Sequence, residues 1–135
     1  GVSLHFMLDR FEFDAQDLAC EMSPTYHTLA STLWTKPDAN IGYLSMGTAH
    51  CPRDGKQGVA LVDAIARTSP DDAKRATIFL SWAWSYNLLM VHSALRRWAR
   101  GRGIAHSDVF IWICFFCNNQ FRLLRDGSDH KPEDM

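Results

Sequence analysis

Two short apolar runs stand out along the chain, separated by a segment with helical periodicity. Thr77–Ser81 and Val109–Ile113 are continuous rather than alternating runs, a pattern typical of strands buried on both faces of a parallel sheet. Between them, Asn87–Ala99 repeats its apolar residues at helical spacing. A helix that joins two parallel strands makes a crossover that is nearly always right-handed. Residues 76–124 are therefore predicted to form a strand–helix–strand unit of an open, parallel α/β sheet.

The predicted central helix has recognisable ends. The stretch Arg96–Arg102 places cations at its C-terminus, where they complement the helix dipole, although a phosphate-binding patch is the alternative interpretation. Gly101 and Gly103 are expected to terminate the helix. His92 lies on the apolar face, so we expect a hydrogen-bonded core histidine rather than a catalytic base.

The first 75 residues carry weaker patterns. Gly1–Cys20 mixes apolar and charged positions and fits either an edge strand or an irregular wrap. Ser23 and Pro24 signal a helix start, which predicts a helix over Pro24–Trp34. The other expected elements are a loop at 38–58 with a turn at 53–55, a short helix at 59–67 and one helical turn at 69–72.

These patterns predict three parts. Residues 1–75 form a helical and loop lead-in packed on the sheet, residues 76–125 form the strand–helix–strand core, and residues 126–135 form a polar tail. Because the chain begins with Gly1 rather than Met, we expect an excised piece whose sheet is incomplete, with further strands beyond either end.

Composition narrows the class of protein. The 135 residues are 47% apolar, which suits one globular domain. The 14 basic and 15 acidic residues give a net charge of -1, so nucleic acid is not an expected partner. Residues 77–95 lack charged side chains, but their polar residues and change of periodicity argue against a membrane span. With no signal peptide and no dense disulfide framework, a cytoplasmic location is expected.

Polar and aromatic side chains follow both predicted strands. Ligands of open α/β sheets bind outside the carboxyl ends of the strands, so these residues are the candidate ligand-binding site. The aromatic residues have core packing as their alternative role, and the amides have turn formation. The candidates are Ser81, Trp82, Trp84, Tyr86, Cys117, Asn118, Asn119 and Gln120.

Two motifs at these strand ends resemble a known group. Ser81–Trp84 is similar to a serine–aromatic–x–tryptophan strand end. Trp112–Gln120 is similar to a tryptophan–isoleucine–aspartate–x–x–cysteine–x–asparagine–glutamine strand end. Together they resemble the TIR-like superfamily, especially its heterokaryon-incompatibility (HET)-type members, over residues 76–124. The matching residues are Ser81, Trp82, Trp84, Cys117, Asn119 and Gln120.

The resemblance implies a flavodoxin-like α/β sandwich and two kinds of function. Some members cleave NAD⁺, and others are assembly modules in signalling or cell death. Here Cys114 stands where the motif has aspartate, and the chain's only glutamates, Glu12, Glu21 and Glu133, do not match the catalytic glutamate of a later helix. We therefore expect a signalling or interaction module without catalysis, with protein partners or self-association. The alternative is an NAD⁺-cleaving or nucleotide-binding enzyme, with NAD⁺ as its substrate and no other cofactor indicated.

Cys114 and Cys117 form a C-x-x-C pair at the end of the second strand. Two buried, packed thiols are the expected reading. A thiol redox protein is the second alternative, because a helix N-terminus lowers a thiol pKa. Zinc held together with His50 and Cys51 is disfavoured, because a C-x-x-C beside an adjacent His-Cys pair gives poor geometry.

Overall fold

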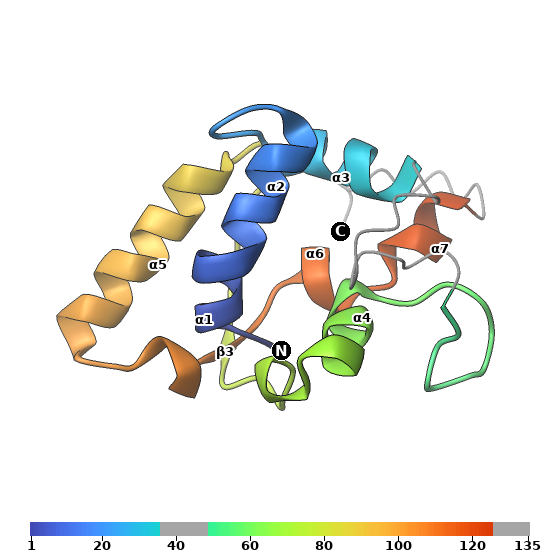
Figure 1. The fold of residues 1–135 in the computed structure, drawn as a ribbon. Helices are drawn as coiled ribbons and strands as arrows, with labels where there is room; N and C mark the ends of the chain where they lie inside the picture. The colour runs from blue at the N-terminus through green and yellow to red at the C-terminus, as the bar shows by residue number, and fades with distance from the viewer. Residues whose placement is uncertain (36–48, 126–135) are drawn as a thin grey trace.

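The fold consists of a small mixed sheet, with helices in the segments that join its strands (Figure 1). The computed structural model describes residues 1–35 and 49–125. Its three strands lie in the order β1-β3-β2, with β1 at Val2–Ser3, β2 at Ile78–Phe79 and β3 at Phe110–Trp112. The helices are α1 (Leu4–Phe6), α2 (Glu12–Ala19), α3 (Tyr26–Thr35), α4 (Leu61–Thr68), α5 (Leu88–Arg102), α6 (Cys114–Cys117) and α7 (Gln120–Arg125). A π-helical segment, η1 (Met7–Phe11), joins α1 to α2, and 3₁₀ turns lie at η3 (Pro70–Asp72) and η4 (His106–Asp108).

The predicted strand–helix–strand unit is confirmed as β2–α5–β3. β2 and β3 are parallel, with Ile78 opposite Ile111. The side chain of Asn87 caps α5 by accepting the backbone N–H of Met90 at 2.9 Å. Gly103 closes the helix in the left-handed conformation, at φ 62°. The prediction that Gly101 also ends the helix is wrong, because Gly101 lies within the last turn of α5.

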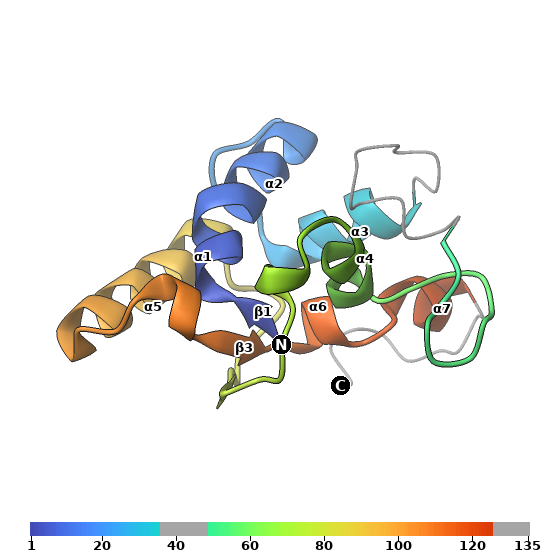
Figure 2. The ribbon, with the colours of Figure 1, turned by 60° about the horizontal axis from the view of Figure 1, so that its bottom comes forward.

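The sheet is mixed rather than wholly parallel, because β1 runs antiparallel to β3. After β1 the chain becomes helical through α1, η1 and α2, so an irregular wrap is wrong and the edge strand is only two residues long. Leu4, Phe11 and Ala15 recur at helical spacing and are completely buried. This first helix lies alongside α5 in both ribbon views (Figures 1 and 2).

β2 is an edge strand, and this overturns the prediction that it is buried on both faces. Phe79 is 67% exposed, and no described strand pairs with the far side of β2. The two faces of β2 differ as well. The ring of Phe79 stacks on Trp112, whereas Ile78 and Leu80 line a small hollow against α5.

The remaining predicted helices are confirmed, but the residue that caps the start of α3 differs from the predicted one. α3, α4 and the η3 turn lie close to their expected positions. Ser23 does not cap α3, because its hydroxyl accepts the N–H of Leu89 in α5 at 3.2 Å. Thr25 caps α3 instead, through the N–H of Thr28. Residues 36–48, which contain most of the expected loop, and the tail at 126–135 lie outside the described residues.

The core centres on two phenylalanines of α6. Phe115 and Phe116 are completely buried and pack edge-on against one another and against Phe11. Phe115 also meets Tyr26 edge-on, with centroids 4.9 Å apart. α6 therefore joins the N-terminal helices to the strand ends. No helix of the described residues has the length and apolar character needed to cross a membrane.

Candidate functional site

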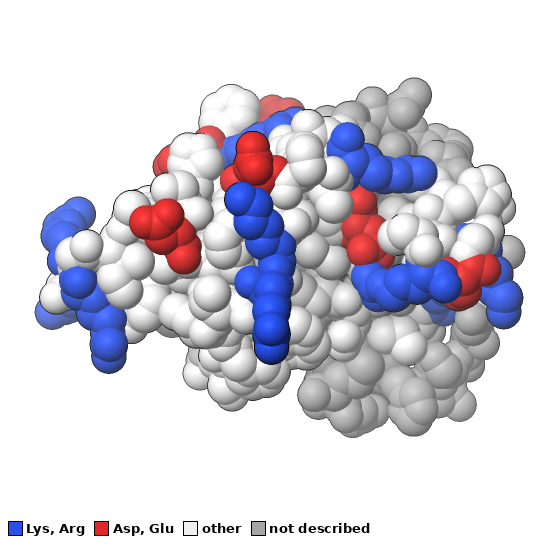
Figure 3. Space-filling view, turned by 90° about the horizontal axis from the view of Figure 1, so that it is seen from below, with Lys and Arg blue, Asp and Glu red and all other residues white. Residues whose placement is uncertain are grey.

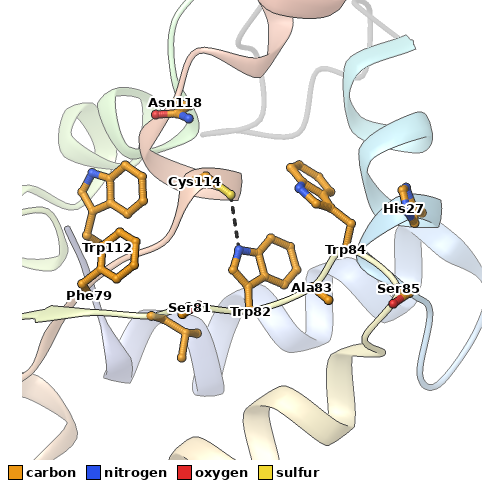
Figure 4. A pocket seen from close by; sticks show the side chains of 11 residues that line it. His27, Phe79, Ser81, Trp82, Ala83, Trp84, Ser85, Trp112, Cys114 and Asn118 are labelled. Carbon is orange, nitrogen blue, oxygen red and sulfur yellow. Dashed lines mark hydrogen bonds between the residues drawn. The ribbon is translucent and has the colours of Figure 1, made fainter. Parts of the chain in front are cut away.

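A pocket of about 430 Å³ opens where β2 and β3 end (Figure 4). This is the edge at which open α/β sheets bind ligands. Its lining includes neither a carboxylate nor a lysine or arginine among the described residues, so its polarity comes from hydroxyl, amide, thiol, imidazole and backbone groups. The lining residues are His27, Phe79, Leu80, Ser81, Trp82, Ala83, Trp84, Ser85, Trp112, Cys114 and Asn118.

Four aromatic rings form the walls of the pocket. Phe79 and Trp112 are stacked, with centroids 5.0 Å apart and planes 16° apart. Trp82 and Trp84 lie 5.1 Å apart and are tilted by 41°. In Figure 4 the first pair lies on one side of Cys114 and the second pair on the other. Aromatic faces of this kind stack on planar rings.

The segment that carries the two tryptophans is anchored to the start of α3. The backbone N–H groups of Tyr26 and His27 donate to the carbonyls of Tyr86 and Trp84, each at 3.1 Å. The Tyr26 ring packs edge-on against Trp82 at 4.4 Å. The positions of these rings are therefore fixed by the core before any ligand arrives.

Cys114 occupies the wall at the end of β3. The indole N–H of Trp82 donates to its Sγ at 3.3 Å, as Figure 4 shows. The two thiols pack against the core, as expected, but the prediction that they are buried is wrong, because Cys114 and Cys117 are each only partly buried. Burial raises the pKa of the Cys117 thiol, which disfavours its reactive thiolate. All described cysteines are free.

The three consecutive amides serve different purposes. Asn118 lines the pocket. Asn119 donates to the carbonyl of Gly58 at 3.0 Å and caps α7 by accepting the N–H of Arg122. Gln120 is buried and donates to the carbonyl of Cys114 at 3.2 Å. The last two amides therefore hold the backbone around the pocket.

Of the eight predicted site residues, the pocket gathers Ser81, Trp82, Trp84 and Asn118. Tyr86 lies instead in a groove beside α5, and Cys117, Asn119 and Gln120 lie outside the lining. Phe79 and Trp112 also line the pocket, although the prediction placed them inside the strands, and Cys114 lines it although it was considered only for its thiol chemistry. His27 carried no signal in the sequence, because it reaches the pocket from a distant helix.

A second cluster of polar groups lies in the core, away from the pocket lining. Tyr26 Oη lies 3.0 Å from His92 Nε2, and His92 Nδ1 lies 2.8 Å from the Glu12 carboxylate. Arg96 donates to the same carboxylate oxygen at 2.8 Å. His92 is completely buried, as expected for a hydrogen-bonded core histidine. The cluster ties α2, α3 and α5 together.

The pKa values of this cluster follow from its burial. Desolvation lowers the pKa of His92 and outweighs the opposing effect of Glu12. For Glu12, burial alone would raise the pKa, but the hydrogen bonds from His92 and Arg96, together with the charge of Arg96, lower it. Burial raises the pKa of Tyr26 far above its usual range, so Tyr26 keeps its proton. Because a neutral His92 donates its Nδ1–H to the Glu12 carboxylate, its Nε2 accepts from Tyr26.

The described residues contain no group of three or more His, Cys, Asp or Glu side chains placed to hold a metal ion. The site is thus characterised by its aromatic walls and by Cys114. Comparisons with protein-family models, with curated proteins and with solved structures each found no match to this chain.

Proposed function

We propose that this chain is a TIR-like signalling or interaction module, of the flavodoxin-like type, without catalysis of its own. The observation that carries the proposal is that the segments carrying the two motifs border one pocket, although Cys117, Asn119 and Gln120 of the second motif lie outside its lining. Ser81, Trp82 and Trp84 follow β2, while Cys114 and Asn118 follow β3, and all five line the same cavity. The order of the motifs along the parallel unit is the order that the TIR-like resemblance implies.

The positions of two residues, Cys114 and Glu12, support the absence of catalysis. The position of the motif's aspartate is taken by Cys114, whose sulfur accepts a hydrogen bond from Trp82. Glu12 is hydrogen-bonded to His92 and Arg96 in the core, and it is absent from the pocket lining. A carboxylate committed to two partners in this way is a poor general base.

Incubation of the purified chain with NAD⁺ tests this part of the proposal. Chromatography should show NAD⁺ loss no faster than with a heat-inactivated sample of the same preparation. Release of nicotinamide well above that control would overturn the proposal and favour the enzymatic alternative. A Cys114→Asp variant, which restores the motif's carboxylate, should be tested alongside.

Binding of a nucleotide base is the second candidate function, and the aromatic walls favour it. Stacking of a base on an aromatic side chain contributes about 1–3 kcal/mol, and the pocket offers four rings. Because no described lysine or arginine lines the pocket, the phosphates should add little. Adenosine and AMP are therefore expected to bind with similar affinity.

Tryptophan fluorescence can follow this binding, because Trp82, Trp84 and Trp112 line the pocket. Titration with adenosine, AMP and NAD⁺ should give a saturable change that Asn118→Ala weakens. Trp98→Phe is the matched control, because Trp98 lies on α5 and outside this pocket. A flat titration of the folded wild-type chain would exclude the nucleotide hypothesis.

A further inference from the structure

The edge of β2 and the adjacent face of α5 form an apolar groove of about 530 Å³. Phe79 and Trp112, whose rings stack on one another, are not part of its lining. Tyr86 and Met90 in this groove are 44% and 49% exposed, which is unusual for large apolar side chains. The principal lining residues are Leu80, Tyr86, Met90, Ala94, Leu95 and Trp98.

The main chain of β2 offers hydrogen-bonding groups beside this groove. Leu80 donates its N–H to the carbonyl of Trp112 at 2.9 Å, inside the sheet. Because successive residues of a strand turn their amides to opposite sides, Phe79 directs its N–H and carbonyl to the free edge. No described strand pairs with that edge. An edge of this kind accepts an additional strand.

Arginine side chains lie at one end of the groove. The apolar stripe of Met90, Ala94 and Trp98 continues at helical spacing to Arg102, whose guanidinium lies 5.8 Å from the centroid of the Trp98 ring. Arg97 flanks the same stripe and is exposed. Figure 3 shows Lys and Arg side chains gathered over the C-terminal end of α5. Neither arginine has an ion pair with a described residue.

The start of β2 lies at the same end, because α5 runs back along the strand. Arg75, just before β2, also has no ion pair with a described residue. Asp71 nearby is paired with Lys74 at 3.3 Å. Residues 73–107, which contain the whole edge and groove, include no aspartate or glutamate. The β2 edge of a second copy would therefore bring no anion to these arginines.

We infer that the groove binds an extended segment of another protein, which adds to β2 as a further strand. Its alternate apolar side chains enter the space between β2 and α5. Acidic residues at one of its ends pair with Arg97 and Arg102. This inference rests on the proposed interaction function and specifies the chemistry of the partner.

Selection of random displayed peptides of about 12 residues on the full chain tests the inference. The retained peptides should alternate apolar residues and carry aspartate or glutamate at one end. Phe79→Pro removes the free N–H of the edge but keeps the Leu80 hydrogen bond, and it should weaken binding about tenfold relative to Phe79→Thr. Phe79→Thr is the matched control, because it loses the ring but keeps the N–H.

The charged end is tested separately. The double variant Arg97→Glu, Arg102→Glu should weaken the same peptides about tenfold and reduce the salt dependence of binding. Arg67→Glu is the control, because Arg67 is exposed in the last turn of α4, a different helix. It should leave the affinity unchanged.

The outcomes separate this inference from the proposed function. If the retained peptides bind all these variants equally well, the groove is not their binding site and the inference is overturned. The proposed interaction function would still stand. Retention of no peptide would overturn the inference, because the groove would then not bind an extended segment, and would leave the proposed function to its own test. A dimer of the chain that Phe79→Pro dissociates would also overturn the inference, because the occupant would then be a second copy rather than an acidic segment.

Discussion

The buried cluster of Tyr26, His92 and Glu12 should make the fold sensitive to mild acid. His92 is completely buried, and desolvation lowers its pKa below the ordinary value. Below pH about 6.5 the unfolded chain binds a proton at this histidine, whereas the folded chain does not. The free energy of unfolding therefore falls as the pH falls, from about 6.5 down to the folded pKa of His92.

The size of this change in the free energy of unfolding follows from the binding of one proton. A group that is protonated only in the unfolded state changes the free energy of unfolding by about 1.4 kcal/mol per pH unit. Between pH 6.5 and 5, His92 should therefore remove up to about 2 kcal/mol. The lowered pKa of Glu12 acts in the same direction but at more acidic pH, because unfolded glutamate titrates near 4.3.

Urea denaturation at a series of pH values from 7.5 to 5 measures this slope. His92→Gln cannot titrate, so its free energy of unfolding should be lower at pH 7 but nearly independent of pH down to 5. His50→Gln, at an exposed position, should retain the wild-type slope. An equal slope in the wild type and in His92→Gln would refute the reasoning, whatever the absolute stabilities are.

Three further substitutions test the core and the backbone around the pocket. Phe115→Ala should cost about 3–5 kcal/mol in urea denaturation, because the ring is completely buried among other aromatics. Gly58→Ala should lower the melting temperature more than Gly55→Ala does. Both glycines have positive φ, but of the two only Gly58 would bring its new Cβ against another side chain, at 2.8 Å. Asn119→Ala should lose about 1–2 kcal/mol of stability in the same assay, whereas Asn118→Ala should leave stability nearly unchanged.

The β2–α5–β3 unit could be predicted because its signals are local. The short apolar runs and the helical spacing between them all lie within residues 76–124. The exposure of Phe79 could not be predicted in this way. An apolar run has the same appearance in a central strand and in an edge strand, and only the pairing of the whole sheet distinguishes them.

The first twenty residues show the opposite case. Their helix was not predicted because charged residues interrupt the apolar positions Phe6, Leu8, Phe11 and Phe13. All of these except Phe13 are buried in the core. The π-helical segment further disturbs the spacing of apolar residues. β1 has two residues and pairs with a strand more than a hundred positions away. No local pattern encodes that contact.

Four of the eight predicted site residues line the pocket, because the location of the site follows from the strand ends whereas the direction of each side chain does not. The rule that ligands bind at strand ends located Trp82, Trp84 and Asn118 correctly in one pocket. It could not separate Asn118 from Asn119, because the start of α7 decides which amide faces the cavity and which one binds Gly58. Adjacent residues of the same chemistry thus take up a lining role and a structural role.

Cys114, at the position where the TIR-like resemblance would have an aspartate, connects the geometry of the pocket to the proposed function. A carboxylate there would carry a charge into an aromatic cavity and would favour cationic ligands or general-base chemistry. The thiol instead accepts the indole N–H of Trp82 and leaves the wall without a formal charge. That hydrogen bond also holds Trp82 between Tyr26 and the pocket. Under the proposed function, Cys114 therefore both removes a candidate catalytic carboxylate and helps to fix an aromatic surface, which suits a module that recognises a planar ligand without transforming it.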